Sequence, residues 1–221
     1  MNRTGVSSHR IVKSTYLAFV LLMMAWIGAW LLKISLEQSV LWLTTSKGSF
    51  FYWLTAKLVI WIVPALWLLR LSNRSLRKVF NFPQWKGWLF WGGGIGLLIA
   101  LTGIIPNYLQ GNDLLPTQFS FPLLNLLVVA PILEEFLMRG AIQGNLQGRY
   151  SSWRANVITS VMFVILHIPG WYFMGVLWDN LTQPLGGALS IFLVSLGFGY
   201  ATHRSQSVMG GVLSHFLNNL F

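Results

Sequence analysis

The sequence lacks cysteine and has very little charge. Of its 221 residues, 9% are charged and five are acidic. The absence of cysteine excludes disulfide bonds, thiol catalysis and Cys-ligated metal sites, so any metal must be held by His, carboxylate or amide groups. A soluble domain usually carries about 25% charged residues. The shortage of charge therefore argues against a soluble domain.

Apolar residues make up 55% of the chain, and they occur in long blocks between polar connectors. We predict an all-α fold, a polytopic transmembrane bundle of about seven to eight helices. The expected helices cover about residues 15–32, 50–69, 87–105, 121–147, 153–168, 185–201 and 208–221. The first block is long for a signal peptide, and no small-x-small cleavage site follows it, so we expect a retained helix. Residues 171–183 are either an interfacial or re-entrant piece or part of an eighth span.

Positive charge gathers in the connectors. The net charge is +10, and eleven of the fifteen Lys and Arg residues lie in the N-terminal tail and in residues 70–86, 149–154 and 202–207. With seven spans these segments share one side, which predicts an integral membrane protein with its N-terminus in the cytoplasm. In a bacterium this would be the inner membrane. We expect contact with membrane lipids and no nucleic-acid partner.

Two features inside the early blocks have ordinary explanations. Lys57 lies within an apolar block, and we expect it to snorkel toward the nearer surface, with a role in an ion pathway as the alternative. Residues 91–96 are rich in glycine but lack the strand and the Lys-Ser/Thr of a phosphate loop. We therefore expect them to allow close helix packing. Residues 1–110 contain no catalytic motif, whereas residues 111–221 are expected to form a catalytic helical core, both within one integrated membrane domain.

The most informative stretch is Glu134-Glu135-Phe-Leu-Met-Arg139, which carries two carboxylates and an arginine within an apolar segment. Ionisable groups in membrane segments are rare and often functional. Glu135 and Arg139 are four residues apart and face each other on a helix, so we predict a structural ion pair. Glu134 points about 100° away and has no partner in its own helix. An apolar environment suits such a carboxylate to general-base catalysis near neutral pH, and we assign Glu134 this role.

Three more polar residues lie in the later apolar blocks. His167 follows Phe163 by one turn, and His215 and Asn219 are four residues apart on one helix face. At about 1.5 Å per residue, Glu134 and His167 both lie roughly 20 Å from the turn near residue 150. By the same rise, His215 is roughly 13 Å from the 202–207 turn on the same side. We therefore predict that Glu134, His167, His215 and Asn219 converge in one membrane cavity.

These groups suit hydrolysis of an amide without a covalent intermediate. Glu134 would take a proton from water, and His167 would hold that water directly or through a metal. His215 and Asn219 would donate to an oxyanion, or His215 would ligate the metal. The sequence has no His-Glu-x-x-His motif and no membrane aspartate dyad. A serine mechanism is also disfavoured, because Ser214 and His215 are adjacent and do not face each other on a helix.

The three motifs resemble those of the CPBP (Abi) family, which comprises type II CAAX-prenyl proteases and bacteriocin-processing or bacteriocin-immunity membrane proteins. The family pattern is Glu-Glu-x-x-x-Arg, Phe-x-x-x-His and His-x-x-x-Asn or Asp. All three are present here in that order, and the resemblance covers about residues 120–221. It implies an intramembrane endopeptidase with Glu134 as its base, acting on a membrane-associated peptide or protein by CAAX-type or leader-peptide processing.

The resemblance leaves the metal open, because members of the family are often described as metalloproteases. Zinc would be held by His167 and His215, with Glu134 as a further ligand. Two His and an Asn alone make a poor zinc set, and we favour metal-free activation of water. Two other functions remain as alternatives: a non-catalytic protein for bacteriocin self-immunity or membrane-protein assembly, and a transporter that uses the cluster as a proton relay.

Overall fold

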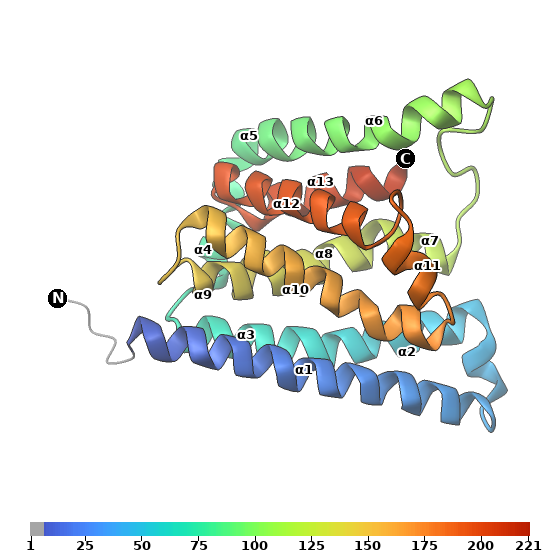
Figure 1. The fold of residues 1–221 in the computed structure, drawn as a ribbon, viewed down its shortest axis with the longest axis horizontal. Coiled ribbons are helices and arrows are strands. Elements are labelled where there is room, and N and C mark those ends of the chain that lie inside the picture. Colours follow the sequence, from blue (N-terminus) through green and yellow to red (C-terminus); the bar gives the residue numbers. More distant parts are fainter. Residues whose placement is uncertain (1–6) are drawn as a thin grey trace.

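The computed structural model describes residues 7–221, and every regular element in them is helical. Five segments in them are long and apolar enough to cross a membrane: Ser8–Glu37, Ser46–Leu71, Leu76–Leu109, Phe121–Leu146 and Ser152–Phe173. Two further helices, α12 (Ala188–Ser205) and α13 (Val208–Leu220), run alongside these segments (Figure 1). The described part of the chain thus forms the predicted polytopic helical bundle.

Most of these segments consist of short helices joined end to end. The first is the single helix α1 (Ser8–Glu37), which is followed by a 3₁₀ turn, η1 (Leu41–Thr44). The other α-helices are α2 (Ser46–Lys57), α3 (Val63–Leu71), α4 (Leu76–Phe80), α5 (Trp85–Trp88), α6 (Gly94–Leu109), α7 (Phe121–Leu124), α8 (Ala130–Glu135), α9 (Gly144–Leu146), α10 (Ser152–Phe173) and α11 (Leu177–Thr182). A 3₁₀ turn, η3 (Phe82–Gln84), precedes α5, and π-helical turns join other pieces: η2 (Leu58–Ile62), η4 (Leu89–Gly93), η5 (Asn125–Val129) and η6 (Phe136–Gln143).

The fifth span is longer than predicted, and no eighth span follows it within the described residues. We expected the helix to stop at Pro169, but α10 continues through this residue to Phe173. Packing explains the extension, because Trp171 is buried and Phe173 stacks on Trp30 of α1 with ring centroids 5.8 Å apart. The next helix, α11, has only six residues and is too short to span.

The connectors that carry most of the positive charge lie at one end of the bundle. Figure 1 shows the start of α1, α4 and the turn from α9 to α10 at its left end, and the turn from α12 to α13 lies there too. Arg3 of the N-terminal tail lies outside the described residues. The opposite end holds α7, α11 and the C-terminus of the chain (Figure 1). Charge is therefore segregated along the helix axes, as the connector pattern predicted.

Close helix packing positions α13. A Cβ atom at Gly92 would lie 2.6 Å from the Gly210 oxygen, and one at Gly96 would lie 2.9 Å from the Cα of Ser214. The expectation that these glycines allow close packing is confirmed, since no larger residue fits there without movement. Ser214 also donates a hydrogen bond of 2.9 Å to the Gly92 carbonyl. α13 is thus fixed against η4 and α6, and its opposite face turns toward the bundle interior.

The hydrophobic core lies between α1, α3, η6 and α10. Leu137, Met138 and Ala141 of η6 are completely buried in it. Many large apolar side chains on the outer faces are exposed instead, among them Leu17, Leu98 and Leu193. Such a surface matches lipid rather than water.

Candidate active site

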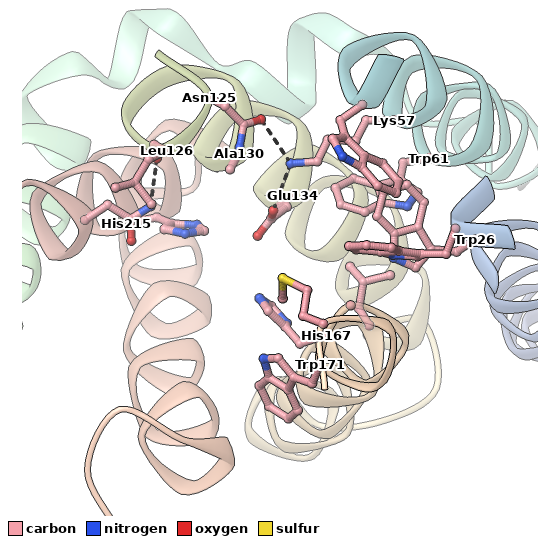
Figure 2. Close-up of a pocket in the computed structure, with 16 residues that line it drawn as sticks. Trp26, Lys57, Trp61, Asn125, Leu126, Ala130, Glu134, His167, Trp171 and His215 are labelled. Carbon is pink, nitrogen blue, oxygen red and sulfur yellow. Dashed lines mark hydrogen bonds and ion pairs between the residues drawn. The ribbon is translucent and has the colours of Figure 1, made fainter. Parts of the chain in front are cut away.

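A cavity of about 480 Å³ opens between the helices and is lined by all four predicted site residues. Glu134 comes from α8, His167 from α10, and His215 and Asn219 from α13. Figure 2 shows the Glu134 carboxylate and the rings of His167 and His215 pointing into the same space. The structure therefore brings together residues that lie up to 85 positions apart in the sequence.

Lys57 also lines this cavity, and the expectation that it snorkels to a surface is wrong. Its side chain is buried, and the ammonium lies 3.5 Å from Oε1 of Glu134. It also lies 3.5 Å from the amide oxygen of Asn125 and 5.0 Å from the ring centroid of Trp61. A buried carboxylate offsets the cost of burying the ammonium, so the side chain has no reason to reach the membrane surface.

Glu135 is the centre of a second, fully buried polar cluster. Oε2 of Glu135 accepts a hydrogen bond of 3.1 Å from Nε of Arg139, which is the predicted ion pair. Oε1 lies 3.2 Å from Nδ1 of His215. Arg139 also donates to the hydroxyl of Ser195 at 2.5 Å and to Gln143 at 3.3 Å. This cluster orients the His215 ring from behind, outside the cavity.

In both cavity histidines, His167 and His215, the Nδ1 nitrogen makes a hydrogen bond outside the cavity. Nδ1 of His167 lies 2.7 Å from the carbonyl oxygen of Phe163, so this nitrogen carries the hydrogen and donates it. Neutral His167 therefore has its lone pair on Nε2, where it can accept a hydrogen bond from water. His215 likewise donates from Nδ1 to the Glu135 carboxylate. Its Nε2 has no hydrogen-bond partner among residues 7–221.

Asn219 is held by the neighbouring backbone. Its amide nitrogen donates a hydrogen bond of 2.8 Å to the Leu126 carbonyl, and its oxygen accepts one of 3.0 Å from Asn218. An amide nitrogen has two hydrogens. One of them is therefore left for a group in the cavity.

Tryptophan covers one side of the cavity. The tryptophans that line it are Trp26, Trp30, Trp53, Trp61 and Trp171. Trp26 and Trp61 contact each other with ring centroids 4.7 Å apart, and Trp171 lies 5.8 Å from the His167 ring. The indole nitrogens of Trp30 and Trp61 are buried and have no partner among the described residues. The wall thus combines a large apolar surface with two free hydrogen-bond donors.

The side chains do not fit a protein-held zinc ion. Within residues 7–221, no three His, Cys, Asp or Glu side chains gather closely enough to hold a metal. The Lys57 ammonium beside Glu134 opposes a divalent cation at that carboxylate. Asn219 already uses its amide oxygen and one of its amide hydrogens. These contacts do not fit a zinc ion that is held by protein side chains alone in the described part of the chain.

Comparison with known proteins finds a matching family model for the second half of the chain. Residues 116–221 match the sequence model of a family described as type II CAAX prenyl endopeptidase Rce1-like. Residues 116–221 are an Rce1-like domain. The predicted family is confirmed for this part of the chain, and the Rce1-like domain contains Glu134, His167, His215 and Asn219.

A relative extends the similarity beyond the Rce1-like domain. It is an uncharacterized 24.3 kDa protein of Escherichia coli, 27% identical over 225 residues, which cover 92% of this chain and 93% of that protein. No solved structure matches the chain. The apolar helices and the match of residues 116–221 to the Rce1-like model together indicate an integral membrane protein.

Sequence reasoning missed the cavity residues that lie before the Rce1-like domain. Lys57 and the tryptophans of α1 and α2 come from the part of the chain expected to lack a motif. A signal was available for Lys57. It has no acidic neighbour within its own apolar block, and Glu134 has no basic neighbour on its own helix face, so the two unpaired charges were complementary.

Proposed function

We propose that this protein is an intramembrane endopeptidase in which Glu134 activates water to hydrolyse a peptide bond. The observation that carries the proposal is the convergence of Glu134, His167 and His215 on one cavity inside an apolar bundle. A base, an acceptor for water and an oxyanion donor around one space meet the requirements for direct hydrolysis. The Rce1-like domain supports the same reaction class.

In this mechanism one water molecule bridges Glu134 and His167. One of its hydrogens points to the carboxylate and the other to Nε2 of His167, which directs an oxygen lone pair at the substrate carbonyl carbon. Glu134 takes a proton as the oxygen–carbon bond forms, and the carbonyl electron pair moves to its oxygen. Glu134 then passes the proton to the departing amine as the carbon–nitrogen bond breaks.

His215 and Asn219 stabilise the intermediate oxyanion. The free amide hydrogen of Asn219 donates to it, and Nε2 of His215 does so when that ring is protonated. The Glu135 carboxylate, 3.2 Å away, accepts the hydrogen on Nδ1 and so orients the ring with Nε2 toward the cavity. This role accounts for the buried Glu135 carboxylate on the side of His215 that faces away from the cavity.

The substrate is a membrane-associated peptide or protein, processed in the CAAX or leader-peptide manner. The cavity supports such a substrate, because its tryptophan wall offers apolar area to a lipid-like or hydrophobic segment. We place the basic end of the bundle, with the start of α1, in the cytoplasm, on the argument that positive connectors stay on that side.

The test uses purified protein in lipid nanodiscs, incubated with prenylated CAAX peptides and with leader-peptide precursors. Products are identified by mass spectrometry for the wild type and for Glu134→Gln. Glu37→Gln is the matched control, because Glu37 also pairs with a buried lysine but lies outside the cavity. We expect the wild type and the control to cleave the peptide, also when a chelator is present. We expect Glu134→Gln to cleave none. Undiminished cleavage by a folded Glu134→Gln would refute the proposal.

A further inference from the structure

Lys57 is held in the cavity by polar contacts with residues that are far away in the sequence. It ends α2, its ammonium lies 3.5 Å from both Glu134 Oε1 and Asn125 Oδ1, and only 7% of the residue is exposed. The ammonium is also 5.0 Å from the Trp61 ring centroid, within range of a cation–π interaction. Every close neighbour of the charge is thus a group of the cavity wall.

The helix that carries Glu134 is distorted where it meets Lys57. Asn125 and Glu134 are nine residues apart, which in a regular α-helix would put them on roughly opposite faces at about 100° per residue. The π-helical turn η5 begins at Asn125 and lies between them. A π turn changes this angular register, and such turns are frequent at functional sites. Both side chains consequently reach the same ammonium.

Stability alone does not account for this ion pair. Replacing a buried pair with apolar residues is often neutral or stabilising. The chain contains a useful contrast in Lys33, which is also buried but pairs with Glu37 four residues along the same helix and donates to the Leu43 carbonyl. That pair is local and lies outside the cavity, whereas Lys57 reaches across 77 positions to the one carboxylate assigned as base.

We propose that Lys57 is a positioning residue for the reaction, acting through Glu134. This inference rests on the proposed function and adds to the Rce1-like domain a group from outside residues 116–221. The ammonium places a positive charge 3.5 Å from Oε1 of the proposed base inside an apolar cavity. It also fixes the carboxylate through Oε1, which leaves Oε2 free for the water. In this role Lys57 exchanges no proton with substrate.

The kinetic test compares Lys57→Met with Lys57→Arg in nanodiscs. For Lys57→Met we expect kcat to fall by about 10- to 100-fold with little change in KM, a part of the roughly 10²- to 10⁴-fold that a positioned base contributes. Lys57→Arg keeps the charge and should recover at least half of the loss on a logarithmic scale. Lys33→Met is the matched control, and its folded fraction should retain the wild-type kcat.

A second measurement does not depend on activity. Thermal unfolding of Lys57→Met, Glu134→Gln and the double variant should show that each single change lowers Tm, because it leaves one buried charge unpaired. The double variant should recover at least half of the larger drop. This experiment tests the pair even if no peptide offered is a substrate.

The outcomes separate this inference from the proposed function. If Glu134→Gln abolishes cleavage while Lys57→Met keeps the wild-type kcat, Lys57 is not a positioning residue and the proposed function stands. Equal inactivity of folded Lys57→Met and Lys57→Arg would contradict a role for the charge. Additive losses of Tm in the double variant would contradict the pairing itself. If the wild type cleaves nothing while the Tm values are coupled, the pair is real and the proposed function is what fails.

Discussion

Nδ1 of His215 lies 3.2 Å from Oε1 of Glu135, so a carboxylate from α8 orients an imidazole from α13. The other oxygen of Glu135 accepts a hydrogen bond of 3.1 Å from Arg139. Neither Glu135 nor the Arg139 side chain has any exposed surface. One carboxylate thus joins the structural ion pair to the candidate active site, and its removal should affect both stability and turnover.

The Glu135→Ala variant should be strongly destabilised. It leaves the Arg139 guanidinium buried without its counter-charge, a change that costs about 3–5 kcal/mol of unfolding free energy. Equilibrium unfolding in detergent measures this. Asp179→Ala is the control, because Asp179 is exposed and surface changes usually stay within about 0.5 kcal/mol. The Glu135→Leu/Arg139→Leu double variant should regain part of the loss. A loss for Glu135→Ala as small as that of Asp179→Ala would contradict the structural role of the pair.

The His167→Gln variant should lose turnover while keeping its stability. Within residues 7–221 the imidazole makes one hydrogen bond, to Phe163 of the same helix, so its removal leaves no ion pair broken. We expect kcat to fall by about 10²-fold or more, at the lower end of the range for groups that assist proton transfer. Steady-state cleavage and thermal unfolding, measured on the same preparation, check both statements. A large drop in Tm together with normal kcat would assign His167 to packing instead.

The Gly92→Ala variant tests how α13 is held. The added methyl group would lie 2.6 Å from the Gly210 oxygen, so α13 must move, and we expect a loss of about 1–3 kcal/mol in stability. Gly94→Ala is the matched control, since its methyl group meets nothing within 4 Å. Unfolding of the two variants should differ clearly. Equal stability would mean that this contact does not fix α13.

Local chemistry was predictable from the sequence, and distant pairing was not. The Glu135–Arg139 pair follows from a spacing of four on one helix, and Gly92 and Gly96 signalled close packing before any neighbour was known. The partner of Lys57 lies 77 residues away, where periodicity has no reach. Local rules also favoured ending the fifth helix at Pro169, but the packing of its last turn against α1 overrides them.

The register of the helix that carries Glu134 was also beyond sequence reasoning. A regular helical wheel places Glu134 and Glu135 on different helix faces correctly, because the two residues are adjacent in the sequence. It fails across η5, where the helical turn widens. The helical wheel therefore singled out Glu134 but not Asn125, the second group that contacts the Lys57 ammonium.

The central claim is that Glu134 and His167 act on one water molecule, and a double-mutant comparison of kcat/KM tests it most directly. Residues that act as a unit show strongly non-additive losses. We predict that Glu134→Gln/His167→Gln cleaves peptide no more slowly than the worse of the two single variants, within about threefold. Losses that multiply in the double variant, or wild-type cleavage by either folded single variant, would contradict the account.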